Sequence, residues 1–256
     1  MLSLVRHGAP SDSTPLLIAH GLFGSARNWG AIAKRLSDSR PVLAVDMRNH
    51  AGSFHDGVHD YPALAQDLAQ VIEAEGRAVD VLGHSMGGKA AMVLALTRPD
   101  LVNRLIVADI APVAYAHSQN HLIDAMRALD LSGLAARSEA DKRLAQSIED
   151  PQVRAFLLQS LDLKATPPVW RLNLNALEQQ MDLITGWPDM SARAPFDGPA
   201  LFLAGGLSDY VPAAARPQIK ALFPQARLAR IPGAGHWLHA EKPREFEAAI
   251  RVFLDA

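Results

Sequence analysis

Short runs of apolar residues, many of them β-branched, alternate along this chain with longer segments whose apolar residues have the spacing of a helix. Such runs are typical of buried strands, and their alternation with helices predicts a mostly parallel central sheet flanked by helices on both faces. The expected strands are Leu2–Arg6, Leu16–Ala19, Pro41–Val45, Ala78–Leu82, Leu105–Ala108, Ala200–Leu203 and Leu228–Ile231. The chain is therefore expected to belong to the α/β class.

The clearest helical pattern covers Tyr61–Glu75, where Leu64, Leu68 and Val71 fall on one face. Pro62 stands in the first turn of this segment, a position at which a helix tolerates proline. A last helix is expected from about residue 241 to residue 254.

Residues 111–194 interrupt the alternation, because they contain several helical patterns in a row and no convincing strand. Within them, Ser138 and the Asp150–Pro151 pair look like helix starts. Strand-like sequence then resumes, so we expect a helical insert in a single core made of residues 1–110 and 195–256. Inserts of this kind often form lids over a site.

The 256-residue chain is 49% hydrophobic and carries a formal net charge of −2, with both signs mixed along the sequence. It lacks the basic surplus that binding to phosphate backbones requires, so nucleic acid is not an expected partner. There are no cysteines, which excludes disulfides, thiolate metal sites and a cysteine nucleophile. No basic and apolar leader opens the chain, and no apolar run approaches the ~20 residues that span a bilayer. We expect a soluble, cytoplasmic protein without a membrane partner.

The segment VDVLGHSMGGKAAM contains Gly83, Ser85 and Gly87 in a GxSxG pattern, directly after an apolar run and before a helical one. In this context the serine stands on a strained turn between strand and helix, and the glycines let the turn pack without side-chain clashes. The motif predicts that Ser85 is a catalytic nucleophile, exposed at the start of the helix. His84 is expected to be a packing residue, and Lys89 to lie on a solvated helix face.

A serine hydroxyl is a weak nucleophile near neutral pH, so the chemistry needs a base that approaches it in space. His236 lies in the segment IPGAGHWLHAEKP, in a glycine-rich loop after the last expected strand and before the final helix. The carboxyl ends of parallel strands line a crevice, which makes His236 the expected base. His239 is the competing candidate, but it should already belong to the helix.

Attack on a carbonyl produces an oxyanion, which needs hydrogen-bond donors. In the segment LLIAHGLFGSARNW, His20 ends a strand, so the backbone N–H of Leu22 is placed to join that of Met86 in an oxyanion hole. The apolar side chains of Phe23 and Trp237 are expected to line the substrate pocket.

Six segments spread over almost the whole chain resemble the YbfF-type esterase family of α/β-hydrolases. They are HGLFGSARNW, DMRNH, GHSMGGKAAM, ADIAPV, LFLAGGLSDYV and GAGHWLHAEKP. The resemblance implies the α/β-hydrolase fold and a serine esterase with some activity on acyl-CoA thioesters, and it is weakest between Ala116 and Arg193. Ala51 departs from the family's pattern, which usually has glycine after DMRNH, and a small backbone change is expected there.

The third catalytic group should be a carboxylate that orients the histidine and stabilises the imidazolium. In the commoner layout of the fold it follows the strand before the last, at a position that Ser208 occupies here when Gly205 and Pro212 are aligned. Asp209 falls one residue late. Asp109 ends the strand after the nucleophile helix, where the resemblance also places the acid. Asp109 is therefore the favoured acid, and Asp209 is the alternative.

His55, Asp56, His59 and Asp60 stand close enough in the sequence to suggest a metal site. A polar loop before the helix at Tyr61 explains these residues as well. We therefore expect neither a metal ion nor a cofactor.

Together, the candidate residues predict hydrolysis of a small-molecule carboxylic ester or acyl thioester through an acyl-serine intermediate. The small, alanine-rich insert predicts that short acyl chains are favoured. Acyl transfer to an alcohol and perhydrolysis would use the same residues, so the final acceptor stays open. A catalytically inactive ligand-binding homologue is the alternative from another class, and the complete set of serine, histidine and oxyanion elements argues against it.

Overall fold

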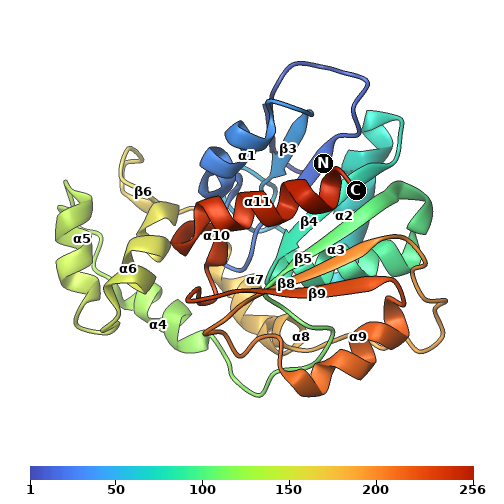
Figure 1. Ribbon diagram of the computed structural model, residues 1–256. Helices are drawn as coiled ribbons and strands as arrows, with labels where there is room; N and C mark the ends of the chain where they lie inside the picture. Colours follow the sequence, from blue (N-terminus) through green and yellow to red (C-terminus); the bar gives the residue numbers. More distant parts are fainter.

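The centre of the molecule is a seven-stranded sheet with the strand order β1-β3-β2-β4-β5-β8-β9 (Figure 1). It is described from a computed structural model that covers residues 1–256. The strands are β1 (Leu4–His7), β2 (Leu16–Ala19), β3 (Val42–Val45), β4 (Val79–His84), β5 (Val102–Ala108), β8 (Ala200–Gly205) and β9 (Ala226–Ile231). Strand β1 is antiparallel to β3, and every other neighbouring pair is parallel. The expected mostly parallel sheet is confirmed, and each expected strand is present with small differences in its bounds.

Helices cover both faces of this sheet. They are α1 (Gly30–Leu36) and α11 (Pro243–Leu254) on one face and α2 (Tyr61–Glu75), α3 (Met86–Thr97) and α9 (Arg216–Leu222) on the other, with the short α10 (Leu238–Glu241) before α11. In Figure 1, α11 crosses in front of the sheet. The bounds of α2 agree with the prediction. None of the helices combines the length and the apolar character that crossing a lipid bilayer requires.

The two faces are apolar because successive side chains of a strand point to opposite sides, and the strands of this sheet are apolar at both kinds of position. In β2, Leu16 and Ile18 belong to the core shared with α1 and α11, whereas Leu17 and Ala19 belong to the core shared with α2, α3 and α9. The sheet is thus buried from both sides, and exposed residues occur in its two edge strands, β1 and β9.

The carboxyl ends of the parallel strands lie at one edge of the sheet and carry the candidate residues. Ser85 directly follows β4, Asp109 directly follows β5, and His236 lies in the loop after β9. Open α/β sheets bind their ligands at this edge. Residues that are far apart in the sequence therefore meet there.

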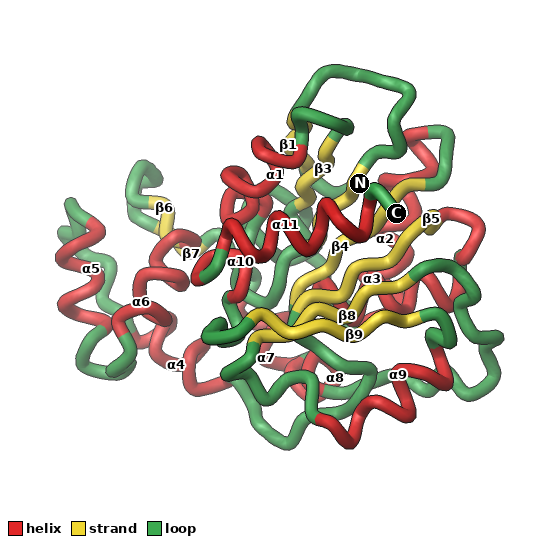
Figure 2. The backbone as a smooth tube through the Cα atoms, viewed as in Figure 1, coloured by secondary structure: helices red, strands yellow, loops and turns green.

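The segment between β5 and β8 is largely helical, as expected. It contains α4 (Asn120–Ala128), α5 (Arg137–Leu144), α6 (Pro151–Leu157), α7 (Leu174–Gln179) and α8 (Met181–Thr185). Figure 2 shows α4, α5 and α6 projecting from one side of the molecule, while α7 and α8 lie close to the body. A short antiparallel pair, β6 (Leu161–Asp162) and β7 (Val169–Trp170), was not expected, because strands of two residues leave no periodic signal.

The two expected helix starts in this segment have different outcomes. Asp150 is the N-cap of α6, where its carboxylate accepts a hydrogen bond from the N–H of Gln152 (2.7 Å). The prediction for Ser138 was wrong, because α5 begins one residue earlier, after Ala136. A serine inside the first turn of a helix looks the same in sequence as a serine that caps it.

Candidate active site

Ser85 lies on a tight turn between the end of β4 and the start of α3. Its backbone has φ +52° and ψ −120°, a conformation that residues other than glycine rarely adopt. A Cβ atom on Gly83 would lie 2.2 Å from the carbonyl oxygen of Gly87, and one on Gly87 would lie 2.4 Å from that of Ala19. Both glycines of the motif are therefore required by close backbone contacts, and the turn holds Ser85 at the edge of the sheet.

The structure brings Ser85, His236 and Asp109 together. Nε2 of His236 lies 3.0 Å from Oγ of Ser85, and Nδ1 of the same ring lies 2.7 Å from Oδ2 of Asp109. The carboxylate of Asp109 is fully buried, while the ring of His236 is partly exposed. A neutral ring that donates from Nδ1 to this carboxylate presents the lone pair of Nε2 to the serine hydroxyl.

Asp109 is held in place by donors from the loop after β8. The N–H of Gly205 donates to Oδ1 (2.8 Å), and the hydroxyl of Ser208 donates to Oδ2. Asp209, the alternative acid, is exposed and has no hydrogen bond to His236. Ser208 thus stands at the position where the commoner layout of the fold has its acid. Its hydroxyl contacts the carboxylate of Asp109, which follows the neighbouring strand β5.

Aromatic rings pack around His236, and two of them are those of His84 and Tyr210. His84, expected to be a packing residue, is buried and donates from Nε2 to the carbonyl of His236 (2.9 Å). The ring of Tyr210 stacks on that of His236 with 4.0 Å between centres, a contact that the sequence had not indicated. His239 lies in α10 and stacks on Trp29 at 4.1 Å, so it is a packing residue and not a second base.

Leu22 and Met86, the residues expected to supply the oxyanion donors, both line the same cavity as Ser85. Met86 is the first residue of α3, so its N–H has no acceptor within the helix. The N–H of Leu22 has no acceptor in the protein, and the loop that carries it passes close to Ser85. A Cβ atom on Gly21 would lie 3.1 Å from Cβ of Ser85. Two unpaired N–H groups beside a serine can bind a developing negative charge.

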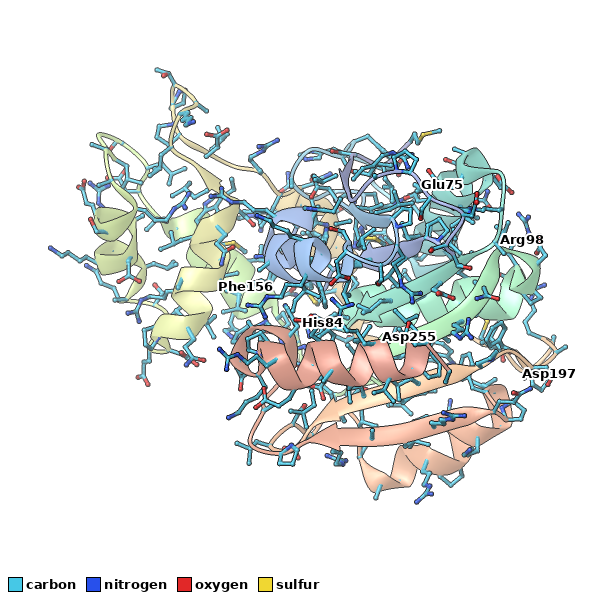
Figure 3. All side chains as sticks on the ribbon, turned by 45° about the horizontal axis from the view of Figure 1, so that its top comes forward. Glu75, His84, Arg98, Phe156, Asp197 and Asp255 are labelled. Carbon is cyan, nitrogen blue, oxygen red and sulfur yellow. The ribbon has the colours of Figure 1, made fainter.

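A cavity of about 290 Å³ opens at these residues and is lined mainly by apolar side chains. Phe23 and Trp237, the expected pocket residues, both line it, together with Trp29. Phe156 on α6 contributes from the insert, and His84 contributes from the end of the sheet (Figure 3). The cavity therefore lies where the insert meets the sheet.

Lys89 is almost fully buried, so the prediction that it lies on a solvated helix face was wrong. It is one turn after Ser85 in α3, and its Nζ donates hydrogen bonds to the carbonyls of Thr185 (2.9 Å) and Gly186 (2.5 Å) at the end of α8. Nζ also lies 4.7 Å from the ring centre of Tyr115. Burial lowers the pKa of Lys89 to about 7. The lysine ties α3, the helix that follows Ser85, to the insert.

The polar loop before α2 does not gather its side chains around one point. Asp60 is the N-cap of α2, where it accepts from the N–H of Ala63 (2.8 Å), and Asp56 accepts from the N–H of Val58 (2.8 Å). His59 is buried, and its Nδ1 accepts a hydrogen bond from the side-chain amide of Asn49 (3.1 Å). No group of three or more His, Asp or Glu side chains is arranged to hold a metal ion.

Known proteins of similar sequence and structure identify the family. Residues 14–243 match the family model described as alpha/beta hydrolase fold. The chain is 42% identical over 248 residues to the Mus musculus protein named sn-1-specific diacylglycerol lipase ABHD11, covering 93% of this chain and 80% of that protein. It is 40% identical over 247 residues to Esterase YbfF of Escherichia coli K12, covering 95% and 94% of the two chains. A solved structure described as a marine microorganism esterase superposes with a TM-score of 0.92 at 39% identity, covering 98% of both chains. The chain therefore belongs to the α/β hydrolase fold family, and its resemblance to the YbfF-type esterases is confirmed.

Proposed function

We propose that this protein is a carboxylic ester hydrolase in which Ser85, His236 and Asp109 form the catalytic triad. The observation that carries the proposal is the unbroken line of contacts from Oγ of Ser85 through the ring of His236 to the buried carboxylate of Asp109, at 3.0 and 2.7 Å. The matched relatives named esterase and lipase support the same class of reaction. Of the two serine and threonine side chains that line the cavity, Ser85 and Thr185, only Ser85 has a hydrogen bond to a histidine.

The reaction begins when Nε2 of His236 takes the hydroxyl proton of Ser85 as Oγ attacks the acyl carbon. The carbonyl oxygen becomes an oxyanion that accepts hydrogen bonds from the N–H groups of Leu22 and Met86. His236 then gives its proton to the leaving alcohol or thiol, and the acyl group stays on Ser85. Water, deprotonated by the same ring, releases the acid and restores the serine. Asp109 stabilises the imidazolium during both steps.

The substrate class that we propose is a small-molecule carboxylic ester or acyl thioester. The cavity of about 290 Å³ lies at the small end of ligand sites in general, roughly 300 to 1,000 Å³, which supports a preference for short acyl chains. The name of the mouse relative points to acylglycerol esters as a second group of substrates to compare. Phe23 and Trp237 supply apolar walls for the acyl or alcohol part.

We further propose that residues 111–194 act as a cap on a core of residues 1–110 and 195–256. Side chains of α4 and α6, among them Leu122 and Phe156, line the same cavity as the nucleophile. Access to Ser85 therefore depends on how this segment lies over the sheet. Lys89 and its two carbonyl partners fix one end of the segment to the nucleophile helix.

The test is hydrolysis of p-nitrophenyl esters from acetate to dodecanoate, a short and a long acyl-CoA, and an sn-1,2-diacylglycerol. The wild type is compared with Ser85→Ala, which should lose on the order of 10⁴-fold or more in kcat. Acetate and butyrate esters are expected to react fastest. A rate that rises steadily with chain length would contradict the short-chain preference without affecting the assignment of the nucleophile.

The alternatives give different results in the same assay. An acyltransferase or perhydrolase would form ester or peracid when an alcohol or hydrogen peroxide is added, at the expense of the free acid. A ligand-binding homologue would hydrolyse no ester faster than Ser85→Ala does. Either result would replace the hydrolase proposal.

A further inference from the structure

The loop that carries the Leu22 N–H is held by the side chains of two buried histidines. It follows β2 and forms no regular helix or strand until residue 26. His20 and His50 are almost fully buried beside it, with 5.0 Å between their ring centres. Neither histidine is part of the proposed triad, so their burial next to the loop that carries the Leu22 N–H needs an explanation.

His20 anchors the peptide unit that contains the oxyanion donor. Its Nε2 accepts a hydrogen bond from the N–H of Met47 (2.9 Å), so in this ring the proton is on Nδ1. Nδ1 therefore donates to the carbonyl of Gly21 (2.8 Å). That carbonyl, which also accepts from the N–H of Gly24 (3.0 Å), and the N–H of Leu22 are opposite ends of one planar peptide group. Donors on the carbonyl therefore fix the direction of the N–H, and His20 supplies the side-chain donor. The same hydrogen bond polarises the peptide and makes its N–H a better donor.

His50 anchors the next peptide unit, between Leu22 and Phe23. Whereas His20 donates through Nδ1, His50 accepts from this peptide through Nε2. Its Nδ1 donates to the carbonyl of Arg48 (2.8 Å), and its Nε2 accepts from the N–H of Phe23 (3.1 Å). Phe23 has φ +62°, in the left-handed region that favours glycine. An acceptor on its N–H helps to hold this unfavourable conformation in the residue that directly follows Leu22.

We propose that His20 and His50 are positioning residues that hold the Leu22 N–H in the oxyanion hole, His20 as a donor through Nδ1 and His50 as an acceptor through Nε2. The inference rests on the proposed acyl transfer at Ser85. Both roles need a neutral ring, and burial lowers the pKa of His20 to about 4 and that of His50 to about 3. Because the oxyanion exists only after attack, loss of either histidine should lower kcat and leave KM nearly unchanged.

Asparagine and glutamine separate the two roles. The amide nitrogen of asparagine sits near the position of Nδ1, and the amide oxygen of glutamine reaches the position of Nε2. His20→Asn therefore keeps the donor to Gly21, whereas His20→Gln keeps only an acceptor for Met47. At the other position, His50→Gln keeps the acceptor for Phe23, whereas His50→Asn keeps only the donor to Arg48.

The experiment measures kcat and KM for p-nitrophenyl butyrate in these four variants, together with Tm and with Ser85→Ala. We expect His20→Gln and His50→Asn to lose about 10- to 100-fold in kcat, a fraction of the loss that follows deletion of an oxyanion donor. His20→Asn and His50→Gln should stay within about 5-fold of the wild type. KM should change by less than about 3-fold in all four.

At His20, asparagine should retain more activity than glutamine, and at His50 glutamine should retain more than asparagine. A merely structural role would not produce this reversal. Equal losses for asparagine and glutamine at both positions, or losses that follow Tm or appear in KM, would overturn the positioning role while Ser85→Ala remained inactive. If Ser85→Ala matched the wild type, the proposed function would fail first and the inference with it.

Discussion

The hydroxyl of Ser208 donates a hydrogen bond to Oδ2 of Asp109, the same oxygen that lies 2.7 Å from Nδ1 of His236. Ser208 stands where the commoner layout of this fold has its acid. Asp109 directly follows β5, and its carboxylate lies beside Ser208. The N–H of Gly205, at the end of β8, donates to Oδ1 of this carboxylate (2.8 Å). One strand supplies the carboxylate and its neighbour supplies the donors that orient it.

Ser208→Ala should therefore lower kcat for ester hydrolysis by about 10- to 150-fold, which corresponds to the loss of one hydrogen bond to a charged group. The loss is smaller than that of Asp109→Asn, because His236 keeps its carboxylate partner. The neighbouring substitution Asp209→Asn is the control. Its side chain is exposed, so its activity should equal that of the wild type. Equal losses for Asp209→Asn and Asp109→Asn would return Asp209 to the role of the acid.

Lys89→Met should flatten the pH dependence of stability above neutral pH. The pKa of Lys89 is lowered to about 7 in the folded protein from 10.5, so between these values the unfolded chain binds a proton that the folded protein does not. Wild-type stability therefore gains up to about 1.4 kcal/mol per pH unit from this group as the pH rises from 7.

The check is urea denaturation of the wild type and Lys89→Met at pH 7, 8 and 9. The methionine leaves the carbonyls of Thr185 and Gly186 without their donor, but that cost is the same at every pH. The difference in free energy of unfolding between the two proteins should thus shift in favour of the wild type with rising pH. A constant difference would mean that the lysine is charged in the folded state throughout this range.

Stability should fall steeply as the pH drops below about 6.5. Burial lowers the pKa of His20 to about 4 and those of His50 and His239 to about 3, from 6.5. Between 6.5 and these values the unfolded chain binds protons that the folded protein does not, so each ring contributes a loss of up to about 1.4 kcal/mol per pH unit. Denaturation at pH 7, 6 and 5 measures the slope.

His239→Phe isolates one of these rings, because phenylalanine keeps the stacking on Trp29 and removes the titrating group. Below pH 6.5, the free energy of unfolding of the variant should change less steeply with pH than that of the wild type. The difference in slope should be up to about 1.4 kcal/mol per pH unit, which corresponds to one proton. Identical slopes would show that His239 is already protonated in the folded protein.

Ala51→Gly should stabilise the protein by about 0.5–1 kcal/mol. Ala51 has φ +45°, a left-handed conformation that disfavours any residue with a Cβ atom. Glycine relieves this strain, and part of the gain is offset by the greater freedom of the unfolded chain. The backbone around it is fixed by a hydrogen bond from its N–H to the carbonyl of Arg171 (2.7 Å). A lower urea midpoint for the variant would contradict the strain argument.

The sheet and the turn that holds Ser85 could be predicted because their signals are local. Apolar runs predict the seven strands of the sheet, and the glycines around Ser85 mark a turn in which an added Cβ atom would lie only 2.2–2.4 Å from a backbone carbonyl oxygen. The acid could not be decided from the residues alone. Asp109 and Asp209 both follow a strand, and both preserve the order serine, aspartate, histidine along the chain. The one-residue offset of Asp209 is explained only by the structure, in which Ser208 takes that position and donates to Asp109.

Lys89 was misjudged because a charge usually marks the exposed face of a helix. All of its neighbours in α3 are small or apolar, and a helix without a polar face is buried on every side. That pattern was the available signal. The partners of Lys89 lie almost a hundred residues away, in an insert whose helical periodicity gives helix positions but not their packing on the core.

Reaction of the protein with a p-nitrophenyl alkylphosphonate, followed by intact mass and peptide mapping, tests directly whether Ser85 is the nucleophile. We expect one equivalent of phosphonate on the peptide that contains Ser85, loss of ester hydrolysis in proportion to labelling, and no label on Ser85→Ala. A wild type that hydrolyses esters but stays unlabelled, or carries the label on another residue, would contradict Ser85 as the nucleophile.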